Sequence, residues 1–290
     1  MKIILISPWR NVWVNYMKTY FESKGHTLDY SDKLEFSKVK DYDVLISGWA
    51  DEGVKLLSKY PKLCSAYYCW VRSYEFWHNN MNSIDFSKFD KVFFVNKYIK
   101  DSLNLSQGEM MPNAIDLEKI KFKIRQPGKE VLFLADINFK KGIPLLIQLA
   151  RRLPDYNFNI YGNITDKRNY LYLRYCNLPN LFVRGYANEI NDVFDKSNYI
   201  LLTSPVEGNP NCIIEGMAAG LKPVIHRFVG SEGQFPEFCY WDTIDEAADI
   251  IKSKIYISSN YRKWIEEKYD MWEVYKRLEA VVSKEALCNH

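Results

Sequence analysis

The chain has 290 residues, of which 47% are apolar and 26% are charged, and its formal net charge is +3. This length fits two domains of ordinary size, and the composition is typical of a globular protein with ample core. The net charge is too small to imply a polyanion partner by itself, and no run approaches the ~18 apolar residues of a membrane span.

Short apolar runs alternate with helical patterns through the first half of the chain. The opening run "KIILIS" is too short for the apolar part of a signal peptide, so we interpret it as a first strand. An amphipathic helix is expected over residues 11–24 and a second helix over residues 51–60. Further strands are expected at 41–49, 63–71 and 90–96.

The second half repeats this alternation. A helix is expected over residues 142–153, and the charged tail from about 260 to 287 predicts one or two more helices. The expected strands are 130–137, 156–162, 180–186, 199–204 and 222–227. Because these strands are almost entirely apolar, the pattern indicates parallel sheets that are covered on both faces.

A turn signal separates the two halves. The basic stretch before it ends in Gln126-Pro127-Gly128, and we place the domain boundary near there, with domains at 1–120 and 121–290. The predicted fold is α/β, with two doubly wound Rossmann-like domains that face each other across a cleft. Ligands of such sheets bind at the carboxyl ends of the strands. The sequence leaves open whether the C-terminal helix crosses back to the first domain.

The cysteines predict neither a disulfide framework nor a metal site. Six are present, without a C-x-x-C pair and without a neighbouring histidine cluster. We therefore expect reduced thiols in a cytoplasmic protein, with peripheral attachment to the inner membrane face left open. No metal ion or other cofactor is expected, because no D-x-D or histidine-rich ligand set lies near the cleft.

Two glutamates flank the start of a predicted helix in "SPVEGNPNCIIEGMAAGLKPV", residues 204–224. Glu207 lies on the loop after a buried strand, and Glu215 lies inside the helix. Asn209 is the expected N-cap and Pro210 the first helical residue.

This helix is expected to end near Ala219, with Gly220 as its C-cap. Its small residues predict close packing, and its amino end offers N–H groups and partial positive charge to an anion. Carboxylates beside an anion site are consistent with a ligand that carries both phosphate and vicinal hydroxyls. The alternative is that both glutamates are solvated charges.

Three ordered segments resemble family 4 retaining glycosyltransferases of the GT-B fold. They are the glutamate segment above, "VLFLADINFKKGIPLLIQLARRLPDYNFNIYGN", and "FDKVFFVNKYIKDSL" followed by "MMPNAIDLEKI". Together they cover about residues 89–229. The resemblance implies transfer of a sugar from a nucleotide-diphosphate sugar to an acceptor hydroxyl, with retention of configuration.

The resemblance also implies roles for individual residues. Glu207 matches the glutamate that contacts the donor sugar, and Glu215 matches the one that binds the nucleotide ribose. Lys141 matches the lysine that neutralises the diphosphate, and Lys140 is the alternative beside it. Further donor contacts fall on the helix start and on the turn that meets the base, namely Gly208, Asn209, Pro210, Asn211, Arg184 and Tyr186.

The chain departs from the family pattern at several positions. Asp136 stands where the family carries an arginine, so one diphosphate contact is either missing or supplied by another residue, for which Arg10 is the candidate. The glycine-rich loop after the first strand is replaced by "SPWRNVW", and the hinge glycine is Ala114. The family histidine that touches the donor sugar has no clear match, although His78 lies in the region.

Aromatic residues are frequent in the first domain, and we interpret some of them as acceptor contacts. Trp9, Trp49 and Trp70 each lie at the carboxyl end of a predicted strand and face the expected cleft, where their rings could stack on a sugar or base. Arg72 and Glu75 lie in the same region. The alternative is that these rings form aromatic core.

We interpret the chain as a metal-independent retaining glycosyltransferase, a hexosyl- or pentosyltransferase. Glu75 and His78 are the nearest candidates for the general base that an inverting transfer needs, and neither is supported by a motif. The alternatives are a nucleotide-sugar epimerase or hydrolase of the same fold, and a degenerate transferase that binds carbohydrate or nucleotide. The acceptor could be a glycan, a lipid, a protein or a modified nucleobase, and nothing indicates nucleic-acid or membrane binding.

Overall fold

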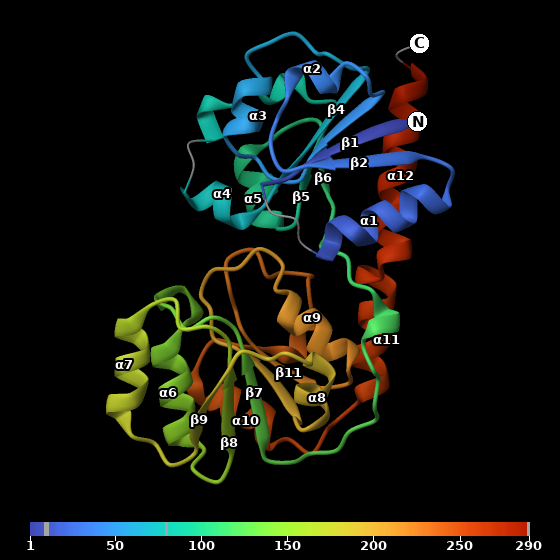
Figure 1. The fold of residues 1–290 in the computed structure, drawn as a ribbon. Coiled ribbons are helices and arrows are strands. Elements are labelled where there is room, and N and C mark those ends of the chain that lie inside the picture. The colour runs from blue at the N-terminus through green and yellow to red at the C-terminus, as the bar shows by residue number, and fades with distance from the viewer. Residues whose placement is uncertain (9–11, 79–80, 289–290) are drawn as a thin grey trace. The chain divides into compact units, whose positions relative to one another are not determined.

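The computed structural model describes residues 1–8, 12–78 and 81–288 (Figure 1). The chain forms two compact units, Met1–Asp116 with Lys268–His290, and Leu117–Glu267. Each unit holds one parallel sheet of six strands with helices packed on it. The α/β class with two doubly wound domains is therefore confirmed.

The sheet of the first unit has the order β2-β1-β3-β4-β5-β6. The order in which the chain adds strands reverses at β1, since β1 pairs in parallel with β2 on one side and with β3 on the other. The strands are β1 (Lys2–Ile6), β2 (Thr27–Ser31), β3 (Val44–Ser47), β4 (Ala66–Val71), β5 (Lys91–Phe94) and β6 (Gly108–Met110). The helices are α1 (Val12–Ser23), α2 (Phe36–Val39), α3 (Glu52–Leu57), α4 (Ser73–His78), α5 (Lys97–Leu103) and α12 (Met271–Cys288).

Both faces of this sheet are buried, as its apolar strands predict. Along β1, Ile3 and Leu5 join one core cluster, whereas Ile4 and Ile6 join the other. This alternation follows from the period of two in a strand. The first of the two clusters also contains buried residues of α1 and α12, so α12 completes the cover of that face.

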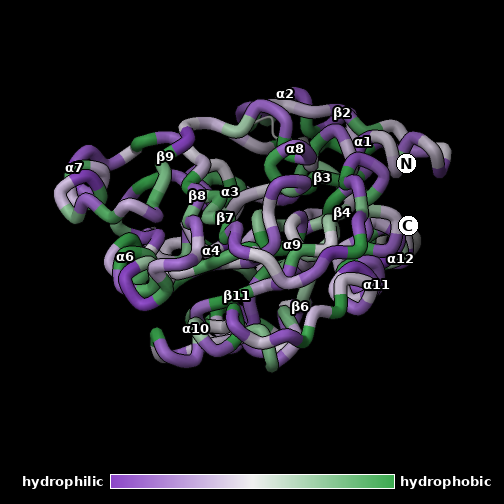
Figure 2. The backbone as a smooth tube through the Cα atoms, turned by 90° about the horizontal axis from the view of Figure 1, so that it is seen from below, coloured by the Kyte–Doolittle hydropathy of each residue, from purple (hydrophilic) through white to green (hydrophobic). Residues whose placement is uncertain are grey.

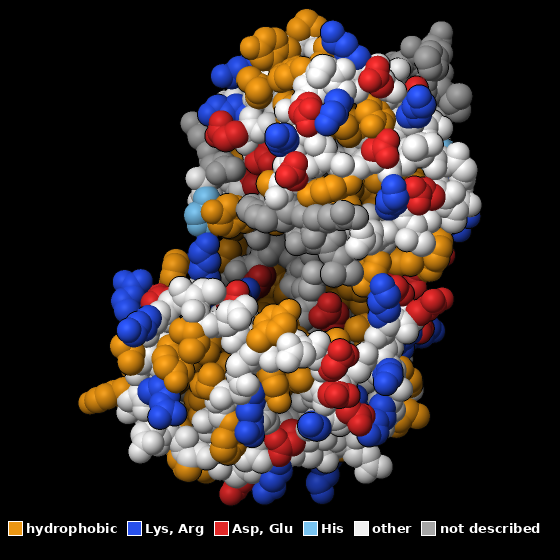
Figure 3. Space-filling view, in the orientation of Figure 1, with side chains coloured by type: hydrophobic (Ala, Val, Ile, Leu, Met, Phe, Trp, Pro, Cys, Tyr) orange, Lys and Arg blue, Asp and Glu red, His pale blue; other side chains and the backbone are white. Residues whose placement is uncertain are grey.

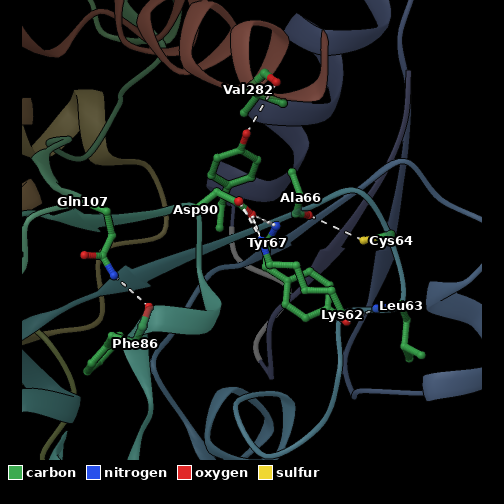
Figure 4. A network of polar contacts seen from close by, with 10 residues as sticks. Lys62, Leu63, Cys64, Ala66, Tyr67, Phe86, Asp90, Gln107 and Val282 are labelled. Atoms are coloured by element: carbon green, nitrogen blue, oxygen red, sulfur yellow. Dashed lines mark hydrogen bonds and ion pairs between the residues drawn. The ribbon is translucent and has the colours of Figure 1, made fainter. Parts of the chain in front are cut away.

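A polar network fastens the amino ends of β4 and β5 in the first unit (Figure 4). Asp90 accepts hydrogen bonds from Lys62 Nζ at 2.6 Å and from the Tyr67 amide at 2.7 Å. The Tyr67 hydroxyl in turn accepts from the Leu63 amide at 2.8 Å. This network therefore lies at the amino edge of the sheet, opposite the carboxyl edge where ligands of such sheets bind.

The sheet of the second unit has the order β12-β11-β10-β7-β8-β9. The strands are β7 (Glu130–Leu134), β8 (Asn157–Tyr161), β9 (Leu181–Gly185), β10 (Tyr199–Leu202), β11 (Lys222–His226) and β12 (Tyr240–Trp241). The helices are α6 (Ile143–Arg152), α7 (Lys167–Cys176), α8 (Ile190–Asp195), α9 (Asn211–Ala218), α10 (Ile244–Lys252) and α11 (Ser258–Tyr269). The α7 segment is largely hydrophilic (Figure 2), and only Leu173 of this helix is buried.

Three strands were missing from the sequence prediction: β2, β6 and β12. Two of them, β2 and β6, carry few buried residues, with Leu28 alone buried in β2 and none in β6. The third, β12, has only two residues. All three lie at sheet edges, where short or half-exposed strands give a weak pattern.

The end of the chain belongs to the first unit, whereas the predicted domain 121–290 included it. Buried Val274, Leu278 and Val282 of α12 pack into the core cluster of the first sheet. Glu279 accepts a hydrogen bond from Tyr20 at 2.8 Å and pairs with His26 at 3.1 Å. The division itself falls between residues 116 and 117. The expectation left open, that the last helix returns to the first domain, is confirmed.

Charged side chains of both signs are interspersed over the face of each unit that Figure 3 shows. Among the described helices, none has the length and apolar character to cross a bilayer. Five cysteines are free thiols, and two of these, Cys69 and Cys239, are buried.

Candidate functional site

The candidate site lies at the carboxyl edge of the second sheet, where the strand order reverses. From β7 the chain proceeds to β8 and β9 on one side, and from β10 it proceeds to β11 and β12 on the other. Since β7 and β10 are paired neighbours, the loops that follow them diverge from one point. Such switch points are where doubly wound sheets bind ligands.

An ion pair joins these two loops. Lys141, after β7, donates a hydrogen bond from Nζ to Glu207 Oε1, after β10, at 2.6 Å. The Lys141 side chain is 27% exposed and that of Glu207 is 14% exposed. Burial lowers the pKa of Lys141, but the charge and hydrogen bond of Glu207 outweigh it and raise that pKa above its ordinary value. The lysine is therefore held as a cation next to a carboxylate that faces the same loop junction.

A glycine turn fixes the position of Lys141. Gly142 has φ of 64°, and a Cβ added there would lie 1.9 Å from the Thr203 carbonyl oxygen. The Thr203 hydroxyl also donates to the Lys141 carbonyl at 2.6 Å. Only glycine allows so close an approach in this conformation, so the turn is fastened to the end of β10.

Lys140 is fixed differently. Its amide donates to the Asn138 side chain at 3.1 Å. Its ammonium group lies 6.0 Å from the centre of the exposed Phe139 ring. Of the two lysines, Lys141 is thus the one that pairs with Glu207.

The helix α9 begins one residue later than predicted. Pro210 is the N-cap, with an extended ψ of 105°, and its carbonyl accepts from the Ile213 amide at 3.1 Å. Asn209 was the predicted cap, but its side chain is buried and donates to Gln234 instead. The predicted cap is therefore wrong by one residue, and the Asn209 side chain is instead held through its Nδ2 by a tertiary contact.

The small residues of α9 allow close packing, as predicted. A Cβ added at Gly216 would lie 2.9 Å from Ile200 of β10. After the other end of the helix, Gly220 has φ of 87°, and a Cβ added there would lie 2.3 Å from the Lys123 carbonyl oxygen. The helix is therefore held directly against the strand whose loop carries Glu207.

Glu215 is a carboxyl group without a partner among the residues that the structure describes. No hydrogen bond or ion pair involves its side chain there, and burial raises its pKa to about 7. Cys212, one turn earlier, has its pKa raised to about 12 by burial, and it also responds to the charges of Lys141, Glu207 and Glu215. These four groups therefore share one electrostatic environment.

Gln234 is the residue of this site that the sequence did not predict. Its side chain is buried, accepts from Asn209 Nδ2 at 2.8 Å, and donates to the Gly208 carbonyl at 2.9 Å. It thereby holds the turn that carries the predicted contacts between Glu207 and α9. No motif marks this glutamine, because the contact joins residues that lie on different loops.

The predicted base-binding turn follows β9. The Arg184 guanidinium lies 4.6 Å from the Phe182 ring centre and donates to Asn159 at 3.0 Å. Its side chain thus folds back along the sheet. Gly185 has φ of 82°, and Tyr186 is 67% exposed.

Asp136 has a structural contact in place of the family arginine. Its carboxylate accepts from the Asn163 amide at 3.0 Å, which ties the loop after β7 to the loop after β8. Arg10, the candidate substitute for that arginine, and Trp9 lie outside the described residues.

In the first unit, the described residues of the predicted acceptor set lie around half-buried Arg72. Its guanidinium lies 5.0 to 5.8 Å from the ring centres of Trp13, Trp49 and Trp70. It donates to the Gly48 carbonyl at 3.0 Å and to Asn113 at 2.6 Å. This cluster therefore fastens the loops that follow β3, β4 and β6.

Two of these residues are core residues. Trp70 is 3% exposed and donates to the Met111 carbonyl at 3.3 Å. Glu75 is 2% exposed and accepts from the Ala50 amide at 3.0 Å. Burial raises the pKa of Glu75 to about 7 despite these bonds and the nearby Arg72 charge. The alternative that these side chains are core, rather than ligand contacts, fits their burial.

Within the described part of the chain, no group of three or more His, Cys, Asp or Glu side chains is arranged to hold a metal ion.

The two-sheet fold matches solved glycosyltransferase structures over nearly the whole chain. Sucrose-phosphate synthase (tll1590) from Thermosynechococcus elongatus is 13% identical, with a TM-score of 0.76 over 98% of both chains. Anabaena Alr3699/HepE in complex with UDP and glucose is 12% identical, with a TM-score of 0.77 over 98% of this chain and 100% of that one. A glycosyltransferase from Rickettsia africae is 13% identical, with a TM-score of 0.75 over 100% and 99%. At such identities the likeness shows the fold.

The family comparison adds sequence-level support. Residues 115–235 match the family model described as Glycosyl transferases group 1, and this range includes Lys141, Glu207, Glu215 and Gln234. The resemblance to family 4 transferases of the GT-B fold is thus confirmed, and glycosyl transfer is the activity that the match supports. No curated protein sequence matches the chain.

Proposed function

We propose that the protein is a retaining glycosyltransferase that uses a nucleotide-diphosphate sugar. The observation that carries this proposal is the Lys141–Glu207 ion pair at the switch point of the second sheet, beside the amino end of α9 and beside Glu215, which has no partner among the described residues. A nucleotide sugar has a diphosphate between a ribose and a sugar. A cation and a helix amino end can bind the diphosphate, and two carboxyl groups can accept hydrogen bonds from the hydroxyls on either side.

In this proposal the donor replaces Glu207 as the partner of Lys141. Its diphosphate takes Lys141, so that Glu207 can accept hydrogen bonds from the sugar hydroxyls. Glu215 accepts from the ribose diol, and the amides at the start of α9 meet the phosphate oxygens. The base lies against the backbone of the turn 184–187, beside exposed Tyr186.

The transfer then follows a front-face route. The bond between the anomeric carbon and the phosphate oxygen breaks, and the acceptor oxygen bonds to that carbon on the same face. The leaving phosphate oxygen takes the acceptor proton, while Lys141 and the helix amides stabilise the negative charge that develops. Because the cation and the helix supply this stabilisation, we propose that the reaction needs no metal ion.

We propose that the acceptor meets the first unit at the carboxyl edge of its sheet. Trp70 and Glu75 are buried, so among the described residues of the predicted set we propose the half-buried Trp49 and Arg72 as the contacts. Exposed Tyr74 and Trp77 of α4, the helix that follows β4, present further ring surface. Whether the acceptor is a glycan, lipid, protein or modified nucleobase stays open.

A nucleotide panel tests the proposal. UDP is a ligand of Anabaena HepE, which makes it the first probe, with GDP and ADP beside it. A probe at 100 times its dissociation constant stabilises the protein by about 2.7 kcal/mol, which a thermal scan detects. Binding of one diphosphate, and turnover of its sugar conjugate into a glycoside that keeps the anomeric configuration in an early proton NMR spectrum, supports the proposal.

The rival activities predict other products. An epimerase changes the sugar without an acceptor, a hydrolase releases free sugar, and a binding module leaves the nucleotide sugar intact. An inverted anomer, or absence of binding to any of the three diphosphates, contradicts the proposal. No observation in the structure favours one of these rivals.

A further inference from the structure

The side chain of Gln234 lies behind the turn between Glu207 and α9, and the proposed reaction does not use it. Its Nε2 donates to the carbonyls of Gly208 and Gly230, both at 2.9 Å. Its Oε1 accepts from Asn209 Nδ2 at 2.8 Å. The glutamine is 7% exposed, so a single buried carboxamide holds this turn at two points, a backbone carbonyl and a side chain.

These bonds fix the orientation of one peptide plane. In a trans peptide the carbonyl and the following N–H point in opposite directions. Since the Gly208 carbonyl is turned inward onto Gln234, the Asn209 N–H is directed away from Gln234. Glycine at 208 tolerates many other orientations of this plane, and the glutamine bonds select one of them.

Gln234 is itself anchored. Trp264 of α11 donates from its indole N–H to the Gln234 carbonyl at 3.0 Å. The backbone N–H of Gln234 donates to the Ser231 carbonyl at 3.1 Å, and the same carbonyl accepts from the Tyr240 hydroxyl. The glutamine therefore has a fixed support, and it does not depend on a ligand for its position.

We propose that Gln234 is the positioning residue for the diphosphate and sugar part of the donor. This inference rests on the proposed function. The turn that Gln234 holds precedes α9 and follows Glu207, so it sets the amides that meet the phosphates. Glu215 is held independently, because Gly216 beside it packs directly on Ile200 of β10. Loss of Gln234 thus affects the diphosphate end of the donor and spares the ribose end.

Gln234→Glu is the sharpest test. The change keeps the shape of the side chain but removes the two N–H donors and places a carboxylate against two carbonyl oxygens. Gln148→Glu, on the exposed face of α6, is the matched control. Gln234→Met, which removes the polar group without adding charge, serves where the first variant folds poorly. Calorimetry measures each variant with UDP, GDP and ADP and with the parent nucleosides.

At pH 8 we expect Gln234→Glu to weaken binding of the diphosphate about tenfold or more, since it removes two hydrogen bonds, and to leave nucleoside binding within about twofold. At pH 5 the introduced carboxyl group regains a proton and one donor, so the ratio of variant to wild-type affinity recovers. The control keeps wild-type affinity throughout.

A merely structural role predicts another pattern, in which diphosphate and nucleoside affinities fall together with the melting temperature. That pattern overturns the inference, as does unchanged diphosphate affinity in both Gln234 variants. If the wild type binds none of the diphosphates, the proposed function fails first and this inference with it. A wild type that binds while its variants remain unaffected overturns only the role of Gln234.

Discussion

Replacing Glu215 by glutamine should change the free energy of unfolding and the nucleotide affinity in opposite directions. The substitution keeps the size of the side chain and removes its charge. Burial raises the pKa of Glu215 from the ordinary 4.5 to about 7, and no partner among the described residues offsets it. The folded protein therefore carries a carboxylate that would be more stable in water.

The size and sign of this cost follow from linkage. A carboxyl group whose pKa is higher in the folded state destabilises the fold as the unfolded chain ionises, from about pH 4.5 upward. The cost becomes constant above pH 7, where both states are ionised, and the difference between the two pKa values corresponds to about 3 kcal/mol. Glutamine resembles the protonated acid, so Glu215→Gln should be more stable by up to that amount at pH 8 and equal to wild type at pH 4.

Binding should change in the opposite direction. If Glu215 accepts hydrogen bonds from the ribose diol, the variant loses charge-assisted bonds that contribute about 1.5–3 kcal/mol each, and its nucleotide affinity falls about tenfold or more. Binding favours the carboxylate, so wild-type affinity should also fall as the pH drops through 7. The ratio of wild-type to variant affinity isolates this effect from titration of the nucleotide phosphate.

Urea unfolding at pH 4 to 8 and calorimetry with the nucleoside diphosphate measure the two effects. Glu189→Gln is the matched control, because Glu189 is exposed and makes no side-chain bond to the start of α8. If the gain in stability of the variant over wild type is no larger at pH 8 than at pH 4, the burial argument is refuted. A variant that is stabilised but binds the nucleotide as tightly as wild type refutes the ribose assignment.

Two further predictions concern the Lys-Gly turn and the metal. Gly142→Ala should lower the stability of the second unit by about 3 kcal/mol or more in urea unfolding, because strain at positive φ adds to a clash with the Thr203 carbonyl. Gly185→Ala, which has positive φ but open space, should cost only about 1–2 kcal/mol, and equal losses would contradict the role of the close approach. Transferase activity should survive excess EDTA, and loss that magnesium or manganese restores would reject charge stabilisation by Lys141 and α9 alone.

Local sequence patterns were sufficient for much of this fold. The core strands were predictable because each is a run of residues that are buried on both faces, such as β4 or β10. The Lys141-Gly142 turn and the small residues of α9 were predictable because backbone geometry dictates residue type at these positions. The ordered motifs of the second unit then predicted the resemblance that the family model over residues 115–235 supports.

Tertiary contacts account for what the sequence did not predict. Trp70 lies at the carboxyl end of β4, where a ligand contact was predicted, yet its ring is buried in the core, with Arg72 and Trp13 packed against it. Asn209 has the properties of a helix cap, yet Pro210 is the N-cap, and the buried Asn209 side chain donates from Nδ2 to Gln234 on the loop after β11. Neither outcome has a local signal, since the partner residue lies on a different loop in each case.

The Lys141–Glu207 pair leads to a last prediction, which concerns Glu207→Gln. Glu207 pairs with Lys141 in the structure, so a donor diphosphate that binds has to compete with this carboxylate for Lys141. Removing that charge leaves Lys141 with a weaker partner, so affinity for the free nucleoside diphosphate should rise, by about tenfold for each 1.4 kcal/mol of pairing energy that is released. Turnover should fall by a larger factor, because the same carboxylate is proposed to hold the sugar during transfer.

Opposite changes in affinity and turnover are the signature of a residue that binds the lysine at rest and the sugar in the reaction. Lys141→Gln is the matched control, and it should weaken diphosphate binding and lower turnover together. Calorimetry with the nucleoside diphosphate and a transfer assay with its sugar conjugate measure both quantities. If Glu207→Gln instead loses diphosphate affinity, the ion pair stabilises the empty site rather than competing with the donor, and the exchange of partners in the proposed reaction is wrong.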